Sequence, residues 1–395
     1  MSRRLGVSAA LVDGVLHAGD VAVADGVVDA VGLPAARGGA IAVAGLVDVQ
    51  CNGYAGVDLT ALGDAPDDAD APDTDDADDA VAQVGRFRRA VAADGVTAVV
   101  PTIITAAPDT AARALARLDR ARAHDADDAA GARLLGAHVE GPFLAPARRG
   151  THPPVHLRDP DPALQARLFD AGQVAITTIA PELDGAAELV RRARAAGITV
   201  MAGHSDATAA QAHLGFDAGV SGATHLFNAM SGFDHRAPGL AAAALAHPGV
   251  VVTVIADGHH LAPDVLRVVA AAAAGRWALI TDATAAAGMP DGTFVLGDVA
   301  LTLADGAVRN SDGTLAGSAA TLAGCVRTAV AAGIDLATAL VAATATPAGL
   351  VPPARRPHPD LGVLRPGGVA DVTVLDDALE VTAVLLAGQK ITRTE

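Results

Sequence analysis

Eight short apolar runs, most of them separated by helical stretches, occupy the middle of this sequence. Short apolar runs without polar alternation are typical of strands that are buried on both faces of a parallel sheet. Eight strand–helix alternations over roughly 300 residues predict an α/β fold with a (β/α)8 barrel of the TIM type. The expected strands are residues 41–49, 96–104, 133–139, 174–179, 198–202, 222–224, 250–256 and 277–281.

Both ends of the sequence lack this rhythm. In residues 1–44, short apolar runs are broken by Asp13-Gly14 and Asp25-Gly26, and Asp-Gly between β-forming residues is a strong hairpin signal. Turn residues and short β-forming runs return near the C-terminus. We therefore predict a small β-sandwich domain formed from both termini, residues 1–44 and 351–395, beside a barrel domain of residues 45–350.

The segment after the eighth strand is expected to contain a hairpin and two helices. Residues 292–313 have a hairpin pattern with Asp305-Gly306 as its turn. Helical patterns cover residues 315–332 and 336–346, and Pro347 is expected to end the second helix.

Composition disfavours several classes of partner. The net charge of −17 at pH 7 and the 2% of aromatic residues argue against binding to nucleic acid or to an anionic membrane. The acidic tract at residues 64–79 is expected to be a solvated surface loop. Two cysteines are too few for a disulfide framework, and the sequence starts without an apolar signal-peptide core, so we expect a cytoplasmic protein.

Four of the apolar runs end in a residue that can bind a metal or move a proton. Glu140, His204, His225 and Asp282 each close a different expected strand. One such residue alone is more often a capped turn or a hydrogen-bonded histidine than a ligand. Four of them at strand ends would meet at one edge of a parallel barrel, where a buried carboxylate also needs a positive partner. The pattern predicts a catalytic metal site.

The residue types at these positions suit metal-assisted hydrolysis. Glu140, His204 and His225 are ligands for zinc or another divalent ion, and three protein ligands keep one position open for water. A divalent ion lowers the pKa of such a water to about 7. Asp282 can accept the proton of that water and pass it to the leaving group.

Motifs around these residues resemble a known family. The similarity is to the N-acetylglucosamine-6-phosphate deacetylases of the amidohydrolase superfamily, and it extends from about residue 40 to residue 376. The matching segments are residues 138–144 (HVEGPFL), 203–208 (GHSDAT), 224–230 (THLFNAM), 255–260 (IADGHH), 281–288 (TDATAAAG), 313–318 (GTLAGS) and 362–371 (GVLRPGGVAD). Alone, the motif at residues 362–371 marks only the superfamily.

The resemblance implies a hydrolase of amino-sugar catabolism or recycling. Such an enzyme removes the acetyl group from N-acetyl-D-glucosamine 6-phosphate, gives glucosamine 6-phosphate and acetate, and forms a homodimer. Most of the superfamily carries His-x-His on the first strand for a second metal, but here Gln50 and Asn52 occupy those places. Because amides are poor zinc ligands beside imidazole, we expect one divalent ion per subunit, zinc or else iron or another divalent metal. Hydrogen bonding to the loop backbone is the alternative role for both amides.

The resemblance also assigns substrate contacts by position. Asn228 and Ala229 are expected to contact the phosphate, Arg236 to clamp it, and His260 to polarise the amide carbonyl. Further implied contacts are Thr151 and His152, in a loop that can come from the partner subunit, and Leu315, Ala316 and Gly317, which pack on the sugar.

Alternatives stay open for several residues. Arg236 could instead be a surface ion-pair residue, and His152 a plain loop residue. Asp206, where the family often has Asn, is expected to cap the next helix rather than to raise the basicity of His204.

Two rival functions share these features. One is an amidohydrolase with another substrate, such as a different N-acetyl amino sugar phosphate or a cyclic amide. The other is a non-catalytic sugar-phosphate sensor, which would require loss of Asp282 or of a metal ligand, and all four residues are present.

Overall fold

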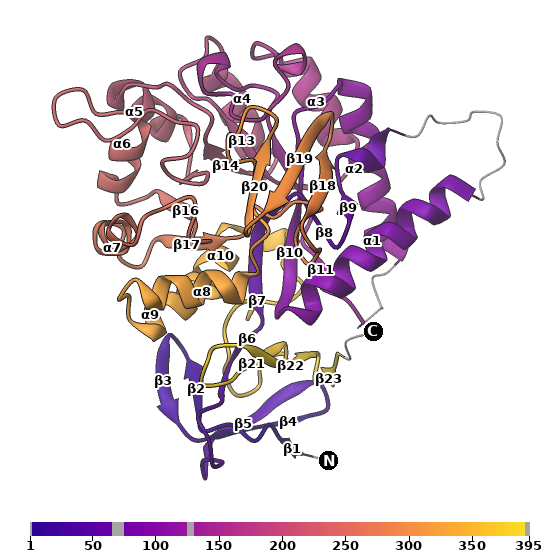
Figure 1. Ribbon diagram of the computed structural model, residues 1–395, viewed down its shortest axis with the longest axis vertical. Helices are drawn as coiled ribbons and strands as arrows, with labels where there is room; N and C mark the ends of the chain where they lie inside the picture. Colours follow the sequence, from indigo (N-terminus) through magenta and orange to yellow (C-terminus); the bar gives the residue numbers. More distant parts are fainter. Residues whose placement is uncertain (1, 65–74, 125–129, 392–395) are drawn as a thin grey trace.

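A parallel barrel forms the larger part of the molecule in a computed structural model that describes residues 2–64, 75–124 and 130–391 (Figure 1). Its strands are hydrogen-bonded in sequence order, and a parallel bridge between Cys51 and Ala283 joins the first strand to the end of the last. The predicted TIM-type barrel is therefore confirmed. The barrel strands are β7 (Leu46–Cys51), β10 (Val96–Ile104), β12 (Ala137–Glu140), β13 (Val174–Ile179), β14 (Thr199–Ala202), β15 (Gly222–Ala223), β16 (Val251–Ile255) and β17 (Trp277–Ile280), with the short β11 (Arg133–Leu134) beside β10.

Helices cover the outside of the barrel. Several bury one apolar stripe: in α4 (Ala186–Ala195) the buried residues Ala186, Leu189, Val190 and Ala193 follow the spacing of one helix face. A side-chain cap starts some of them, such as the Thr208–Gln211 capping box before α5. The other helices around the barrel are α1 (Asp75–Ala93), α2 (Pro108–His124), α3 (Pro162–Asp170), α5 (Ala209–Ala218), α6 (Leu240–Ala246), α7 (Pro263–Ala272) and α8 (Leu322–Ala331).

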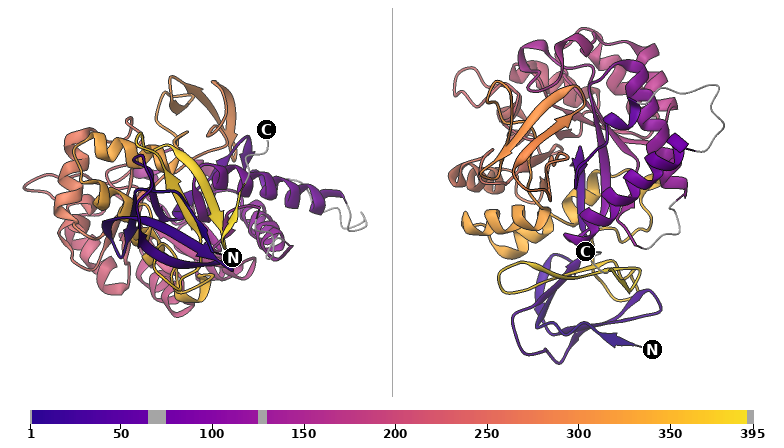
Figure 2. Two further views of the ribbon diagram at one scale, coloured as in Figure 1. Left: turned by 90° about the horizontal axis from the view of Figure 1, so that it is seen from below. Right: turned by 45° about the vertical axis from the view of Figure 1, so that its right-hand side comes forward.

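A small β domain lies below the barrel and contains the first and the last of the described strands (Figure 2). Antiparallel pairing of β6 (Ile41–Ala44) with β21 (Val372–Leu375) joins the N-terminal and C-terminal segments in one sheet. A second, three-stranded sheet packs on it through buried Val, Ala and Leu side chains. The larger sheet also contains β2 (Ala9–Val12), β3 (Val15–Ala18), β22 (Val381–Leu386) and β23 (Gln389–Lys390), and the smaller one contains β1 (Arg3–Arg4), β4 (Asp20–Ala24) and β5 (Val27–Leu33).

The expected first strand, residues 41–49, is divided between the two domains. Residues up to Ala44 belong to β6 in the small sheet, and β7 of the barrel begins at Leu46. Gly45 lies between them, where an added Cβ would come within 1.9 Å of the Thr97 side chain, so only glycine fits this crossing.

The segment after β17 differs from the sequence prediction. A three-stranded meander replaces the expected hairpin: β18 (Gly292–Leu296), β19 (Val299–Ala304) and β20 (Ala307–Asn310). The first expected helix starts seven residues late, at Leu322 of α8, because residues 315–321 form a loop. The second is two helices, α9 (Leu336–Ala342) and α10 (Ala345–Leu350), and Pro347 lies inside α10. A proline is tolerated there because the first turn of a helix leaves its N–H groups unpaired.

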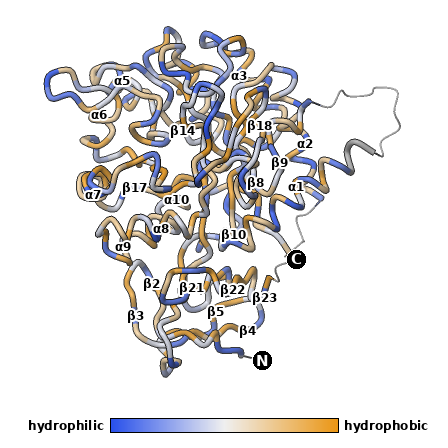
Figure 3. The backbone as a smooth tube through the Cα atoms, viewed as in Figure 1, coloured by the Kyte–Doolittle hydropathy of each residue, from blue (hydrophilic) through white to orange (hydrophobic). Residues whose placement is uncertain are grey.

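Apolar segments run through the barrel strands (Figure 3). The side chains of these strands are nearly all buried. The acidic tract lies mostly outside the described residues, and the part from residue 75 onward is helical, in α1, rather than a loop. No helix in the described part of the chain is both long and apolar enough to cross a membrane.

The remaining short elements are β8 (Gly53–Tyr54), β9 (Val57–Asp58), η1 (Ala61–Gly63), η2 (Pro146–Arg148), η3 (Pro154–His156) and η4 (Pro353–Arg355).

Candidate metal centre and active site

Four polar side chains meet at the carboxyl end of the barrel. Glu140 is the last residue of β12, and His204, His225 and Asp282 follow β14, β15 and β17 within two residues. The last three have left-handed backbones, with φ of 48°, 34° and 50°. Such a conformation costs about 1–3 kcal/mol for a residue other than glycine, and it is typical of functional sites. The fold therefore bears strain at the positions where the sequence predicted the metal and the proton acceptor.

The three expected ligands converge on one point. The Nε2 atoms of His204 and His225 lie 3.2 and 3.1 Å from Oε1 of Glu140, and 3.1 Å from each other. Nδ1 of His204 donates to the carbonyl oxygen of Arg148 at 3.0 Å, so in the neutral ring Nε2 carries a lone pair. All three side chains are buried. Electron pairs from a carboxylate and two imidazoles directed at one point fit a shared cation.

The charges of this cluster reinforce that conclusion. Burial opposes ionisation of Glu140, but its close polar contacts with the His204 and His225 rings outweigh it and hold the pKa of Glu140 well below its usual range. Nδ1 of His225 is buried and has no hydrogen-bond partner in the described part of the chain. Glu140 is therefore a carboxylate at neutral pH, as a metal ligand must be.

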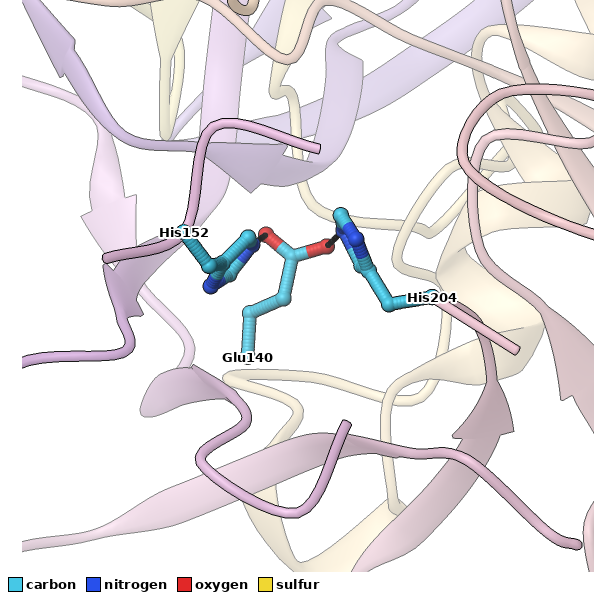
Figure 4. A group of neighbouring side chains, drawn as sticks. All are labelled: Glu140, His152 and His204. Carbon is cyan, nitrogen blue, oxygen red and sulfur yellow. Dashed lines mark hydrogen bonds and ion pairs between the residues drawn. The ribbon is translucent and has the colours of Figure 1, made fainter. Parts of the chain in front are cut away.

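His152 offers a second way to complete a metal site. Figure 4 shows Glu140 between His152 and His204, and the ligand atoms of these three residues lie within 4.8 Å of one another. Nε2 of His152 is 3.9 Å from Oε2 of Glu140, and its Nδ1 is 2.9 Å from Oγ1 of Thr105. We favour His225 over His152 as the third ligand because its nitrogen lies 0.8 Å closer to the shared carboxylate.

Gln50 and Asn52 hold the two carboxylates of the site in place. Nε2 of Gln50 donates to Glu140 at 3.2 Å and to Asp282 at 3.1 Å, and Nδ2 of Asn52 donates to Asp282 at 2.8 Å. The sequence analysis considered metal contact and hydrogen bonding to the loop backbone, but not hydrogen bonding to Glu140 and Asp282. Residues so far apart in sequence give no signal that they pair.

Asp282 is buried and faces Glu140. Burial and the negative charge of Glu140 raise its pKa above the ordinary value. A raised pKa brings a carboxylate toward the range in which a general base works at neutral pH. Asp282 is thus suited to accept a proton and to release it within one reaction cycle.

His260 is oriented by a neighbour that the sequence analysis did not select. Nδ1 of His260 lies 2.8 Å from Oδ2 of Asp257, and hydrogen bonds from His260 hold the pKa of Asp257 below its ordinary value although burial opposes this. Asp257 follows β16 as Asp282 follows β17, so the same strand-end signal marks it. This pairing leaves Nε2 of His260 available to the cavity.

A cavity of about 500 Å³ opens over these residues. Most of the predicted substrate contacts line it, but buried Ala316 does not, and Arg236 lies on an exposed segment outside it. Gly317 packs so closely on Asp282 that an added Cβ would lie 2.6 Å from the Asp282 carbonyl oxygen. The predicted residues in the lining are Glu140, Thr151, His152, His204, His225, Asn228, Ala229, His260, Asp282, Leu315 and Gly317.

Two arginines in the cavity were missed from the sequence. Arg309 comes from β20, and Arg148 from η2, where it forms an ion pair with Asp206 at 2.7 Å. The expectation that Asp206 caps the next helix is wrong, because Thr208 is the N-cap of α5. Arg309 lies on the last strand of the meander, and no motif pointed to it.

Comparison with known proteins identifies the family of this chain. A model of the amidohydrolase family matches residues 41–391. The chain belongs to the amidohydrolase family. Members of this family are metal-dependent hydrolases, and in this amidohydrolase the cluster of Glu140, His152 and His204 could hold a metal ion.

Relatives of this amidohydrolase are sugar-phosphate deacetylases. N-acetylgalactosamine-6-phosphate deacetylase of Escherichia coli O157:H7 is 34% identical over 87% of this chain and 85% of its own length. N-acetylglucosamine-6-phosphate deacetylase of Danio rerio is 36% identical over 88% of this chain and 84% of its own length. A solved structure of a mutant N-acetyl-D-glucosamine-6-phosphate deacetylase from Mycobacterium smegmatis, in complex with N-acetyl-D-glucosamine-6-phosphate, matches with a TM-score of 0.85 at 34% identity, covering 99% of this chain and 100% of that one.

Proposed function

We propose that this chain is a metal-dependent deacetylase of N-acetyl-D-glucosamine 6-phosphate, releasing acetate and glucosamine 6-phosphate. The observation that carries the proposal is the convergence of Glu140, His204 and His225 on one point, with Asp282 across the same cavity. Relatives with this activity that align with most of the chain support it.

The proposed metal centre holds one divalent ion, zinc or else iron or another divalent metal, on Glu140, His204 and His225. When bound, such an ion supplies Lewis acidity to a carbonyl oxygen and acidity to a water. Gln50 and Asn52 stand where most of the superfamily has the two histidines that bind a second ion. Their amide groups donate hydrogen bonds to Glu140 and Asp282, which supports a single metal site. Catalysis belongs to the barrel domain, residues 45–350, in this proposal.

The remaining chemistry falls to side chains of this chain. Asp282 accepts the proton of the attacking water and delivers it to the nitrogen of the departing amine. In its imidazolium form, His260 donates Nδ1–H to Asp257 and presents Nε2–H to the oxygen of the tetrahedral intermediate. Gln50 and Asn52 keep the Asp282 carboxylate in the orientation that this transfer requires.

Substrate binding is assigned to the rest of the cavity. Asn228 and Ala229 are proposed to contact the phosphate, Thr151 and His152 the sugar or phosphate, and Leu315 and Gly317 the sugar face. Arg236 is exposed and does not line the cavity of the chain that carries it. We propose that it reaches the phosphate in the cavity of a second copy of the chain. We therefore propose a homodimer, and we place it in the cytoplasm because Cys51 and Cys325 are free and buried.

Turnover of the zinc-loaded protein tests the proposal. We expect free amine and acetate to appear in equal amounts from N-acetylglucosamine 6-phosphate, and much less product from unphosphorylated N-acetylglucosamine. No turnover with any divalent metal would refute the assignment. N-acetylgalactosamine 6-phosphate is the second candidate substrate, because the Escherichia coli relative is named for it; a higher kcat/KM for that sugar would reassign the preferred substrate.

A further inference from the structure

A second cavity lies at the opposite end of the barrel from the metal centre. It has a volume of about 370 Å³. Its wall includes β11, which pairs with the start of β10, and Gln173, which directly precedes β13, whereas Glu140 pairs with the last residue of β10. The cavity is therefore at the amino ends of the strands and shares no lining residue with the active site.

Arginine dominates the lining of this second cavity. The guanidinium groups come from α1, α2, β11 and the η4 segment, which are brought together only by the fold. None of these side chains is fully exposed, and Arg88 is buried. Such a concentration of positive charge is unusual in a chain whose net charge is −17. The five arginines are Arg88, Arg122, Arg133, Arg355 and Arg356.

Among the described residues, carboxylates pair with Arg122 and Arg133 but not with Arg355 or Arg356. Arg122 pairs with Asp119 at 2.9 Å, and Arg133 with Asp371 at 3.1 Å. In contrast, Arg355 donates to the side-chain oxygen of Gln173 at 2.9 Å.

Arg356 has neutral acceptors as well. It donates to the carbonyl oxygens of Val351 and Gly349, at 2.9 and 3.4 Å. Within the part of the chain that the structure describes, neither Arg355 nor Arg356 has a carboxylate partner. Guanidinium groups held close together and partly withdrawn from water attract an anion.

We propose that this cavity binds a small phosphate-bearing anion at a site separate from the active site. Guanidinium groups recognise phosphate through paired N–H donors, and several of them around one cavity match a group with several oxygens. The volume is that of a small-molecule site. The lining contains no aromatic ring on which a base could stack, which favours inorganic phosphate or a sugar phosphate over a nucleotide.

Equilibrium dialysis of radiolabelled inorganic phosphate against the full-length, zinc-loaded protein at constant ionic strength tests this site. The full chain is used because the arginines of the cavity come from segments on both sides of residues 125–129, which lie outside the described residues. We expect the Arg355→Gln/Arg356→Gln variant to bind phosphate at least tenfold more weakly than the wild type. Phosphate bound only in the active site would be held equally by both proteins, and that result, or no binding to the wild type, would overturn the proposal.

A matched variant controls for the loss of two charges. Arg191→Gln/Arg192→Gln removes two adjacent, exposed arginines from α4 and is expected to leave phosphate affinity unchanged. Arg356 donates to carbonyls at the end of α10, so its loss can unfold the chain. If the double variant does not fold, Arg122→Gln carries the test alone: at least threefold weaker binding supports the site, and unchanged affinity overturns it. None of these measurements requires turnover, so failure of the proposed activity would leave their outcome unaffected.

Discussion

Individual residues at the active site carry strain and charge that the fold must support. His204, His225 and Asp282 have left-handed backbones, and Asp282 accepts hydrogen bonds from the amides of two residues at the end of β7, Gln50 and Asn52. These features cost stability and position reacting groups, which is the usual balance at a catalytic site. Two buried carboxylates, Asp282 and Asp48, illustrate this balance.

Asp282→Asn should remove the proton acceptor while keeping its size. We expect kcat to fall by at least about 10³-fold, because general acid–base catalysis by one side chain contributes about 10²–10⁴-fold and here it serves both proton transfers. KM and bound metal should change little. Steady-state kinetics with metal analysis measures this, and turnover near the wild-type level would mean that another group moves the proton.

Asp48→Asn should flatten the pH dependence of stability. Burial raises the pKa of Asp48 to about 7, although hydrogen bonds from Thr281 and Gln50 oppose this shift. The folded-state pKa exceeds the unfolded value, so the folded protein holds this proton more tightly and loses stability as pH rises from about 4 through 7. Between pH 5 and pH 8 the loss is on the order of 3 kcal/mol.

Urea unfolding at several pH values measures the effect of Asp48→Asn. The variant should lose less stability than the wild type between pH 5 and pH 8. Asp217→Asn, on the exposed face of α5, removes the same charge and should follow the wild-type curve. Parallel curves for the wild type and Asp48→Asn would show that Asp48 ionises normally.

At the scale of elements, loops after different strands depend on one another. The loop that precedes α8 packs on the end of β17: Thr284 N–H donates to the Ser318 carbonyl, and Ser318 N–H to the Asp282 carbonyl, at 3.0 and 2.9 Å. Gly317 makes this contact possible because its φ is +61° and no Cβ fits there.

Gly317→Ala should therefore displace the loop that carries Asp282. We expect kcat/KM to fall at least tenfold, with metal content retained. Gly313→Ala is the matched control, because Gly313 also has a positive φ, +79°, but no atom lies within 4 Å of its added Cβ. Equal kinetic losses in the two variants would show that backbone strain, rather than the contact with Asp282, is responsible.

At the scale of the whole molecule, the proposed metal links four regions of the barrel. Glu140, His204 and His225 come from three strands, and Gln50 connects a fourth to the same carboxylate. An ion that binds only the folded protein stabilises it by mass action. Metal occupancy should therefore raise the melting temperature of the entire barrel.

Removal of the metal by a chelator should lower the melting temperature by several degrees, and one equivalent of zinc should restore it. Calorimetry with metal analysis measures both the shift and the stoichiometry. Glu140→Gln should melt at the same temperature with and without chelator, because the charged ligand is gone. A wild-type melting temperature that ignores the chelator, or two metal ions per subunit, would contradict the single site.

The sequence by itself determined the barrel and the residues at its strand ends. Apolar runs report burial locally, and a polar residue that closes such a run is visible without any tertiary information. Local patterns also have limits. Residues 41–49 look like one continuous strand in the sequence but cross between two domains, and Pro347 looks like the end of a helix but lies in the first turn of one.

Only the tertiary structure decided which side chains meet across long separations in the sequence. Gln50 with Glu140 and Asp282, Arg148 with Asp206, and the arginines of the second cavity come together through packing of the barrel and its loops. Local periodicity carries no signal for such pairs, because it reports whether a residue is buried but not which distant residue lies beside it.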